Sequence, residues 1–262
     1  MKYLTNKDLL REIHLSKNSY CAYVNKSDST YDLILPSVER INRLTISQAR
    51  KARATRMEVE AKAAGTPTEV DPKDIPVTDL VFRIMTWDHI PLSPGRKKTP
   101  KITSDHHVKV NFPPFQHYRL TEEKTPFCVG KSHWRGDVET GHYCRDKGKM
   151  TDNLARMFLK LCERYSSRSN WRGYTYVDEM RGQALLQLSM IGLQFDESKS
   201  SNPFAYYTAA ITNSFTRILN TEKRNQNIRD DILEMNSLNP SYTRQLNNEE
   251  AMRKAREDRG DE

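Results

Sequence analysis

The chain has 262 residues, of which 36% are hydrophobic and 29% are charged, so it can form one large or two small domains with hydrophobic cores. Its 42 Lys and Arg residues against 34 Asp and Glu residues give a net charge of +8, which weakly favours a polyanionic partner. The sequence shows neither the apolar run of a membrane-spanning helix nor an N-terminal signal peptide. We therefore expect a soluble, intracellular protein without a membrane partner, whose scattered cysteines are reduced thiols: Cys21, Cys128, Cys144 and Cys162.

The N-terminal half begins with two predicted helices. The first covers residues 5–15 and is capped by Thr5 or Asn6. The second covers residues 37–64, is rich in Lys and Arg, and ends at Gly65. Its basic side chains either lie against DNA or an acidic protein surface, or form an ordinary solvated face.

Short β-prone runs follow in residues 79–118. Leu80–Met85 and His107–Phe112 are predicted strands, and the turn-rich basic loop Pro91–Pro100 connects them. The pattern predicts a small α+β region with no internal repeat.

Two groups of residues in the same interval could carry chemistry. Asp105-His106-His107 matches the DHH triplet of a phosphoesterase family, but the sequence lacks the further acidic motifs that would hold two metal ions. A zinc site is an alternative for four soft ligands whose spacing is not that of a zinc knuckle: Cys128, His133, His142 and Cys144. Because no acid pair, nucleophile–base pair or glycine-rich phosphate loop is present, we predict no enzyme, no catalytic residue and no cofactor.

The C-terminal half is predicted to be helical. Thr151 or Asp152 caps one helix, and a pair of helices follows from about Val177. The first helix of the pair has an apolar stripe that predicts a buried face: Val177, Met180, Ala184, Leu188, Ile191 and Phe195. A second stripe lies on the opposite side and is either a partner surface or buried within its own domain: Glu179, Gln183, Leu186 and Met190.

The second helix of the pair begins at Asn202-Pro203, a side-chain cap followed by a proline in the first helical position. One face is predicted to be buried: Phe204, Thr208, Ile211, Phe215 and Ile218. The other combines aromatic, amide, hydroxyl and basic groups: Tyr206, Tyr207, Ala210, Asn213, Ser214, Arg217, Asn220, Lys223 and Arg224. Such a face suits stacked bases and bound phosphates, or is ordinary solvated surface. From Asn247 we expect a frayed helix or a disordered tail.

The order of residues in this helix pair resembles region 2 of bacterial sigma factors, and more closely the late-gene sigma factors of T-even and related cyanobacterial bacteriophages. The matching positions are Glu179-Met180, Gly192-Leu193, Phe195-Asp196-Glu197, Asn202-Pro203, Ala205-Tyr206, Thr208, Asn213, Phe215 and Glu222. The opening Tyr3–Leu10 is also similar, and the resemblance covers about residues 1–18 and 145–230.

The resemblance implies a mainly α fold in four parts. These are an N-terminal helix of the sigma domain (1–18), a long α+β insertion (19–145), a region 2-like helical core (146–230) and a charged C-terminal tail (231–262). It also implies a phage-encoded sigma factor that binds host core RNA polymerase and melts a −10-like late promoter element in the cytoplasm of the infected bacterium.

The resemblance assigns residues to both partners. Five residues would dock on the clamp helices of the largest polymerase subunit: Glu179, Gln183, Leu186, Gln187 and Met190. In the promoter-binding set, Tyr206 would stack on a flipped base and Tyr207 would be a second contact or pack. The remaining members would read base edges or hold the backbone: Asn213, Thr216, Arg217, Lys223 and Arg224.

The chain also departs from these families. Ala209 and Ala210 stand where primary sigma factors have a tryptophan pair, and no region 4 is recognisable. The last residues hold no aromatic side chain, so we do not expect the sliding-clamp contact of the T-even factor. Two other classes stay open: a non-enzymatic RNA-binding or structural phage protein with region 2-like helices, and a metal-dependent nuclease that rests only on the His and Cys residues.

Overall fold

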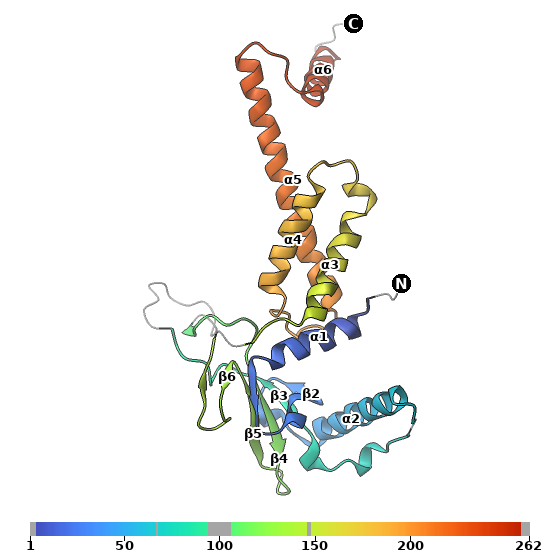
Figure 1. The fold of residues 1–262 in the computed structure, drawn as a ribbon, viewed down its shortest axis with the longest axis vertical. Helices are drawn as coiled ribbons and strands as arrows, with labels where there is room; N and C mark the ends of the chain where they lie inside the picture. Colours follow the sequence, from blue (N-terminus) through green and yellow to red (C-terminus); the bar gives the residue numbers. More distant parts are fainter. Residues whose placement is uncertain (1–3, 67, 94–105, 146–147, 258–262) are drawn as a thin grey trace. The chain divides into compact units, whose positions relative to one another are not determined.

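The computed structural model describes residues 4–66, 68–93, 106–145 and 148–257 (Figure 1). The fold is mainly α: about 54% of the residues are helical, and the described residues form six α-helices and a small mixed sheet. The chain divides into two compact units, each made of separate stretches of sequence. The first unit contains residues 1–161 and 188–208, and the second contains residues 162–187 and 209–262. None of these boundaries coincides with the predicted ones at 18, 145 and 230, so that division stays a prediction.

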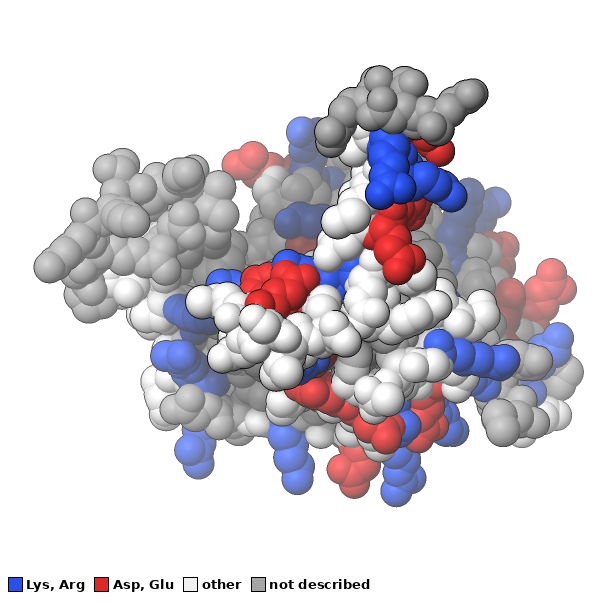
Figure 2. All heavy atoms as spheres, turned by 90° about the horizontal axis from the view of Figure 1, so that it is seen from above, with Lys and Arg blue, Asp and Glu red and all other residues white. Residues whose placement is uncertain are grey.

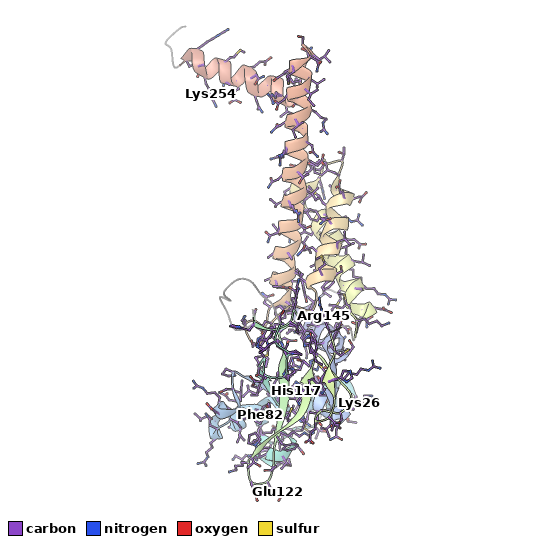
Figure 3. All side chains as sticks on the ribbon, turned by 90° about the vertical axis from the view of Figure 1, so that its left-hand side faces the viewer. Lys26, Phe82, His117, Glu122, Arg145 and Lys254 are labelled. Atoms are coloured by element: carbon purple, nitrogen blue, oxygen red, sulfur yellow. The ribbon has the colours of Figure 1, made fainter. Side chains whose placement is uncertain are left out.

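The first unit is built around a five-stranded sheet in the order β1-β5-β4-β3-β2. Its strands are β1 (Cys21–Tyr23), β2 (Leu33–Leu35), β3 (Phe82–Met85), β4 (Phe115–Leu120) and β5 (Pro126–Ser132). Only β2 and β3 pair in parallel, and Glu122 lies at the β4–β5 turn (Figure 3). A separate two-stranded sheet joins β6 (Trp134–Arg135) to β7 (His142–Tyr143).

The two predicted strands had different outcomes. The run Leu80–Met85 contains β3, so that prediction is confirmed. The predicted strand His107–Phe112 is wrong, because His107 forms only an isolated bridge with Leu92 and Phe112 is buried against Phe115. The alternation of polar and apolar residues in that run ends at the buried ring of Phe112, and the run does not pair as a strand. Residues 94–100 of the predicted basic loop lie outside the described residues.

The first helix, α1 (Asn6–Asn18), agrees with the predicted element and its cap: the Thr5 hydroxyl accepts a hydrogen bond from the Asp8 N–H at 3.2 Å. The basic helix, α2 (Arg43–Ala63), begins later than predicted because residues 38–40 form the 3₁₀ turn η2 (Val38–Arg40). The short turns η1 (Lys26–Ser29), η3 (Pro72–Asp74) and η4 (Val77–Asp79) complete this part of the first unit.

The basic helix α2 is partly a structural element rather than a free cationic surface. Its Ala49 and Ala54 join a hydrophobic cluster with sheet residues such as Phe82. On the same helix, Arg56 and Arg53 form ion pairs with Asp32, whose side chain is fully buried. Two of the basic residues of α2 therefore pair with a buried carboxylate of the first unit.

Helices α3 (Asp152–Ser166), α4 (Val177–Ile191) and α5 (Pro203–Met235) each contribute residues to both units, and α6 (Tyr242–Glu257) belongs to the second. In the second unit, a short turn, η6 (Ser169–Trp171), supplies a ring to a cluster of Tyr165, Trp171 and Phe215, with centroid separations of 5.1 to 6.0 Å. The predicted frayed or disordered tail is helical from Asn247 to Glu257.

The connection between α5 and α6 is held by side chains. The Asp230 carboxylate accepts hydrogen bonds from the Ser241 N–H at 2.8 Å and the Ser241 hydroxyl at 2.7 Å. Arg244 forms ion pairs with Asp231 and Glu234 at 2.7 and 2.9 Å. These contacts hold the turn at which the chain leaves the direction of α5 and continues as a second helix (Figure 3). Among the helices described here, none has both the length and the apolar character needed to cross a membrane.

Candidate nucleic-acid interface

Helix α5 starts at a well-capped end within the first unit. The Asn202 side chain accepts a hydrogen bond from the Ala205 N–H at 3.0 Å, and Pro203 occupies the first helical position, as predicted. A second cap comes from α1, because the Asn6 side chain accepts from the Phe204 N–H at 3.0 Å. Two of the free backbone donors at this helix end are therefore satisfied by side chains.

The two tyrosines near the start of α5 have different environments. Tyr207 is fully buried, donates its hydroxyl to the Gly192 carbonyl at 2.5 Å and packs against Phe158. Its assignment to the promoter-binding set is therefore corrected: Tyr207 is a core residue. Tyr206 is half-buried, with its ring 5.6 Å from that of Phe195, and it keeps part of its surface accessible. Burial raises the pKa of the Tyr206 hydroxyl, so it is a neutral group at physiological pH.

The error at Tyr207 has a geometric cause. The buried stripe of α5 runs through Tyr207, Ile211 and Phe215, whereas Phe204 is 39% exposed. Ser214, also expected on the outer face, is buried as well. The interior face of α5 is thus rotated by about one residue, roughly 100° of helix, from the predicted one at its N-terminal end.

The second unit carries a shallow groove along one side of α5. Its lining residues recur at helical spacing and are all exposed: Asn213, Thr216, Arg217, Asn220, Thr221 and Arg224. No acidic residue lines it. From Asn213 to Arg224 the groove is about 16 Å long, the rise of roughly four to five stacked base pairs. The structure thus brings together Asn213, Thr216, Arg217 and Arg224 of the predicted DNA-binding set, and places Lys223 exposed beside them.

The chemistry of this groove suits a nucleic acid. Amide and hydroxyl side chains can donate to and accept from base edges, and guanidinium groups can hold phosphates. By contrast, the face of the molecule seen in Figure 2 intersperses acidic and basic side chains. The groove differs from that mixed surface because the charged residues that line it, Arg217 and Arg224, are both basic.

Helix α4 carries the predicted polymerase-binding residues. In the second unit, Glu179 is exposed, Gln183 and Gln187 are half-buried, and Leu186 is 60% exposed. In the same stretch, a Cβ atom added at Gly182 would meet no described atom within 4 Å, so this side of the helix is uncovered. Met190, in the first unit, is 73% exposed.

The middle of the predicted apolar stripe is buried in α4: Met180, Ala184 and Leu188 are fully buried, whereas Val177 and Ile191 are half-buried. Phe195 is buried as well, but it lies in the loop after α4 and not on the helix. Since the opposite stripe is not covered in the described part of the chain, the alternative of a helix buried on both sides is not what the structure has.

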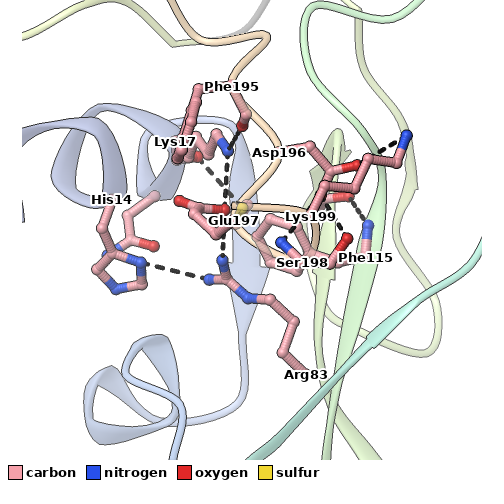
Figure 4. Close-up of polar contacts among 12 residues, drawn as sticks. His14, Lys17, Arg83, Phe115, Phe195, Asp196, Glu197, Ser198 and Lys199 are labelled. Carbon is pink, nitrogen blue, oxygen red and sulfur yellow. Dashed lines mark hydrogen bonds and ion pairs between the residues drawn. The ribbon is translucent and has the colours of Figure 1, made fainter. Parts of the chain in front are cut away.

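A buried ion cluster holds the loop that leads into α5 (Figure 4). Glu197 accepts from Lys17 at 2.9 Å and from Arg83 at 3.3 Å, and the three side chains are 7%, 2% and 0% exposed. Lys17 also donates to the Phe195 carbonyl at 2.7 Å. These contacts connect α1, β3 and the 195–199 loop within the first unit.

The Arg83 guanidinium is held on all sides. Its carbon lies 3.9 Å from the Tyr31 ring centroid and 3.8 Å from that of Phe115. Its Nε donates to His117 Nε2 at 2.9 Å, while His117 Nδ1 lies 2.6 Å from the Asp28 carbonyl. This arrangement assigns a neutral His117 that donates from Nδ1. Burial, followed by the charge of Arg83, keeps the pKa of His117 well below its usual value.

Sequence reasoning missed this cluster. Arg83 interrupts the apolar run of residues 80–85, and a lone charge in such a run is a signal for a buried, paired group. Its acidic partner could not be found from sequence, because Glu197 lies 114 positions away.

The four candidate zinc ligands do not form a site. Cys128 donates to the Gly130 carbonyl, whereas His133 is buried with its ring 4.1 Å from that of Phe112. His142 pairs with Arg135 in the two-stranded sheet. Within the described ranges no group of three or more His, Cys, Asp or Glu side chains is placed to hold a metal ion. Asp105 of the Asp105-His106-His107 triplet lies outside those ranges.

Comparison of the chain with protein-family models, with curated proteins and with solved structures found no match. The resemblance to sigma factors therefore rests on the ordered residues of the sequence alone.

Proposed function

We propose that this protein is a phage-type sigma factor, a non-enzymatic subunit that joins bacterial core RNA polymerase and opens a −10-like late promoter element. The observation that carries the proposal is the α5 groove, in which four residues of the promoter-binding set that the sequence resemblance predicts lie together. Its amide and hydroxyl groups are suited to base edges, and its two arginines to the phosphates on either side.

The outer side of α4 supports the second half of the proposal. A sigma factor must bind a protein partner as well as DNA, and Leu186 and Met190 offer exposed apolar surface within a polar frame. Gly182 adds a point at which a partner can approach the helix backbone closely, since no side chain covers it.

Under this proposal, few aromatic side chains near the start of α5 are available to stack on an unpaired base when the duplex opens. With Ala209 and Ala210 in place of an aromatic pair, the stacking surface near the start of α5 is limited to the accessible part of Tyr206, the residue that the resemblance places on the flipped base, and to the exposed ring of Phe204. Stacking of a base on an aromatic side chain contributes about 1–3 kcal/mol, so an AT-rich element is the expected target.

The decisive experiment combines association and activity. The full chain is mixed with bacterial core RNA polymerase, the complex is isolated by size-exclusion chromatography, and run-off transcription is measured on templates with and without an AT-rich −10-like element. Co-elution together with element-dependent transcripts supports the proposal. A chain that binds RNA but neither co-elutes with core nor directs transcription is an RNA-binding protein instead.

Docking is tested by changing the outer side of α4. Gln183→Ala combined with Leu186→Arg should weaken core binding by at least about 2 kcal/mol, because an unpaired charge would enter a dry interface. Binding is measured by titrating labelled protein with core polymerase, and folding by circular dichroism.

The matched control places the same charge on α6. Leu246→Arg combined with Asn247→Ala changes an exposed leucine of the same unit and should bind core as the unchanged chain does. Equal binding by a folded Gln183→Ala/Leu186→Arg protein would show that α4 does not dock.

Promoter reading is tested within the groove. Asn213→Ala should change sequence preference at one position of the element by about 1–3 kcal/mol, because a base-edge contact is lost. Arg224→Gln should instead weaken binding to all templates and lower the slope of log K against log salt by about one. Affinities are measured for the polymerase complex on single-substitution templates at several salt concentrations.

The control for lost charge is Lys254→Gln on α6, which should leave both the preference and the salt slope unchanged (Figure 3 shows Lys254). If Asn213→Ala weakened every template equally, the division of the groove into base-reading and phosphate-binding residues would be wrong.

A further inference from the structure

A second concave surface lies in the first unit, away from the residues used above. It is a cleft of about 640 Å³ between the N-terminal turns of α2, the η3–η4 segment and the β4–β5 turn. This volume lies within the range of small-molecule sites, roughly 300–1,000 Å³. Four cations line it, one or two from each of these segments: Arg43, Arg50, Lys73 and Lys124.

The charges of this cleft are not balanced. No acidic side chain lines it, and none of the four cations forms an ion pair with another described residue. The Nε atom of Arg50 is shielded from solvent and makes no hydrogen bond to the part of the chain that the structure describes. Arg53 and Arg56, further along the same helix, show the contrast, because both pair with the buried Asp32.

The helix end itself does not account for the cleft. Asn42 caps α2, and its side-chain oxygen accepts from the Leu44 and Thr45 N–H groups at 2.9 and 3.0 Å. Those donors are already occupied. An anion in the cleft would therefore be held by the basic side chains, which come from three separate segments.

Four apolar side chains also line the cleft and are called its apolar floor here: Ile41, Ile46, Val77 and Leu120. An inorganic anion would use only the cationic rim, whereas a ligand with a flat ring and attached phosphates would use both surfaces.

We propose that this cleft binds a nucleotide unit, with its phosphate groups on the four cations and its base on the apolar floor. A free nucleoside triphosphate and a nucleotide within a single strand present the same chemistry. The proposal is independent of the sigma-factor assignment, because it uses none of the residues of α4 or α5.

The test measures binding of two fluorescent probes to the full chain by anisotropy: a nucleoside triphosphate labelled on the ribose, and a short single-stranded oligonucleotide. Arg50→Gln combined with Lys73→Gln should weaken binding of at least one probe by about tenfold or more, because two charge-assisted contacts are lost. A second variant, Lys73→Gln with Lys124→Gln, leaves α2 unchanged and should have the same effect. Saturable triphosphate binding identifies a free nucleotide as the source, and binding of the oligonucleotide alone identifies a strand.

The control has the same change in charge outside the cleft. Lys51→Gln combined with Lys62→Gln alters two exposed residues of α2 and should leave both affinities unchanged. Three results would overturn the proposal: no saturable binding of either probe, equal weakening by the control, or displacement of the bound probe by a polyglutamate peptide and not by unlabelled triphosphate. An unlabelled nucleoside without phosphate should compete at least about tenfold less well than the triphosphate.

Discussion

Replacing Glu197 with glutamine should destabilise the first unit by about 3–5 kcal/mol, because Lys17 and Arg83 would be left buried without their carboxylate. Glutamine keeps the shape of the side chain, so the loss reports charge rather than a cavity. The free energy of unfolding is measured by urea denaturation at pH 7 with far-ultraviolet circular dichroism.

A neighbouring acid provides the matched control. Asp196 is 16% exposed, pairs with the exposed Lys199 at 3.4 Å and accepts a hydrogen bond from the Ser198 N–H at 3.0 Å. Asp196→Asn keeps an acceptor for Ser198 and leaves unpaired only a lysine that water can solvate, so it should cost about 1 kcal/mol, well below the loss from Glu197→Gln. Adding Lys17→Met to Glu197→Gln should recover part of the stability, because one of the two unpaired cations is removed. Equal losses from Glu197→Gln and Asp196→Asn would mean that the buried cluster adds no more than a surface pair.

The pKa values of the cluster define where it responds to pH. Burial raises the pKa of Glu197, but the charges of Lys17 and Arg83 outweigh burial and hold it below its usual value. Burial lowers the pKa of Lys17, because it removes water from the ammonium group; the charge of Glu197 opposes this effect, and that of Arg83 adds to it. A carboxyl group with a lowered folded-state pKa stabilises above its unfolded pKa and loses that contribution only as pH falls through the folded value. Glu197 should therefore not titrate between pH 7 and pH 5.

Acidification from pH 7.5 to pH 5 should nevertheless destabilise the first unit strongly, through its buried histidines. Burial lowers the pKa of His14 from 6.5 to about 4 and that of His133 to about 3, and His117 lies well below 6.5. In the unfolded chain these groups bind protons below about pH 6.5, whereas in the folded chain they stay neutral. Each can contribute up to about 2 kcal/mol of lost stability at pH 5.

The measurement is the slope of unfolding free energy against pH, taken from urea denaturation at closely spaced values between pH 5 and 7.5. This slope is proportional to the number of protons that the chain takes up on unfolding, and His133→Asn should reduce that number by about one. Asparagine suits the left-handed backbone at this position, where φ is 53°. If the free energy of unfolding stayed constant from pH 7.5 to 5, folding would not lower the pKa values of these histidines.

Local signals in the sequence were sufficient for several elements. Thr5 and Asn202-Pro203 were recognised as helix starts because capping depends on residues close in sequence. The exposed side of α5 was anticipated in part, since Asn213, Arg217 and Asn220 recur at the helical period on the predicted outer face, whereas Thr216 was assigned only through the resemblance.

Other features could not be read from local patterns. In the pair Tyr206-Tyr207, both rings fit an aromatic surface or a core, and the choice depends on Gly192 and Phe158, which lie elsewhere in the chain. The sheet was likewise incompletely predicted: β4 and β5 gain their register from each other and β2 pairs with β3 across the whole of α2. Non-local pairings of this kind leave little trace in hydrophobic periodicity.

The separation of Lys17 and Glu197 along the chain has a consequence for synthesis on the ribosome. These residues lie 180 positions apart, so the carboxylate is translated roughly 10–40 s after the lysine at typical rates of about 5–20 residues per second. Until then Lys17, and Arg83 once it has been made, must remain hydrated, and the sheet that will bury them cannot close around the cluster. A nascent chain that stalls before residue 197 should therefore be sensitive to protease and should bind chaperones, even though every strand of the sheet has already been made.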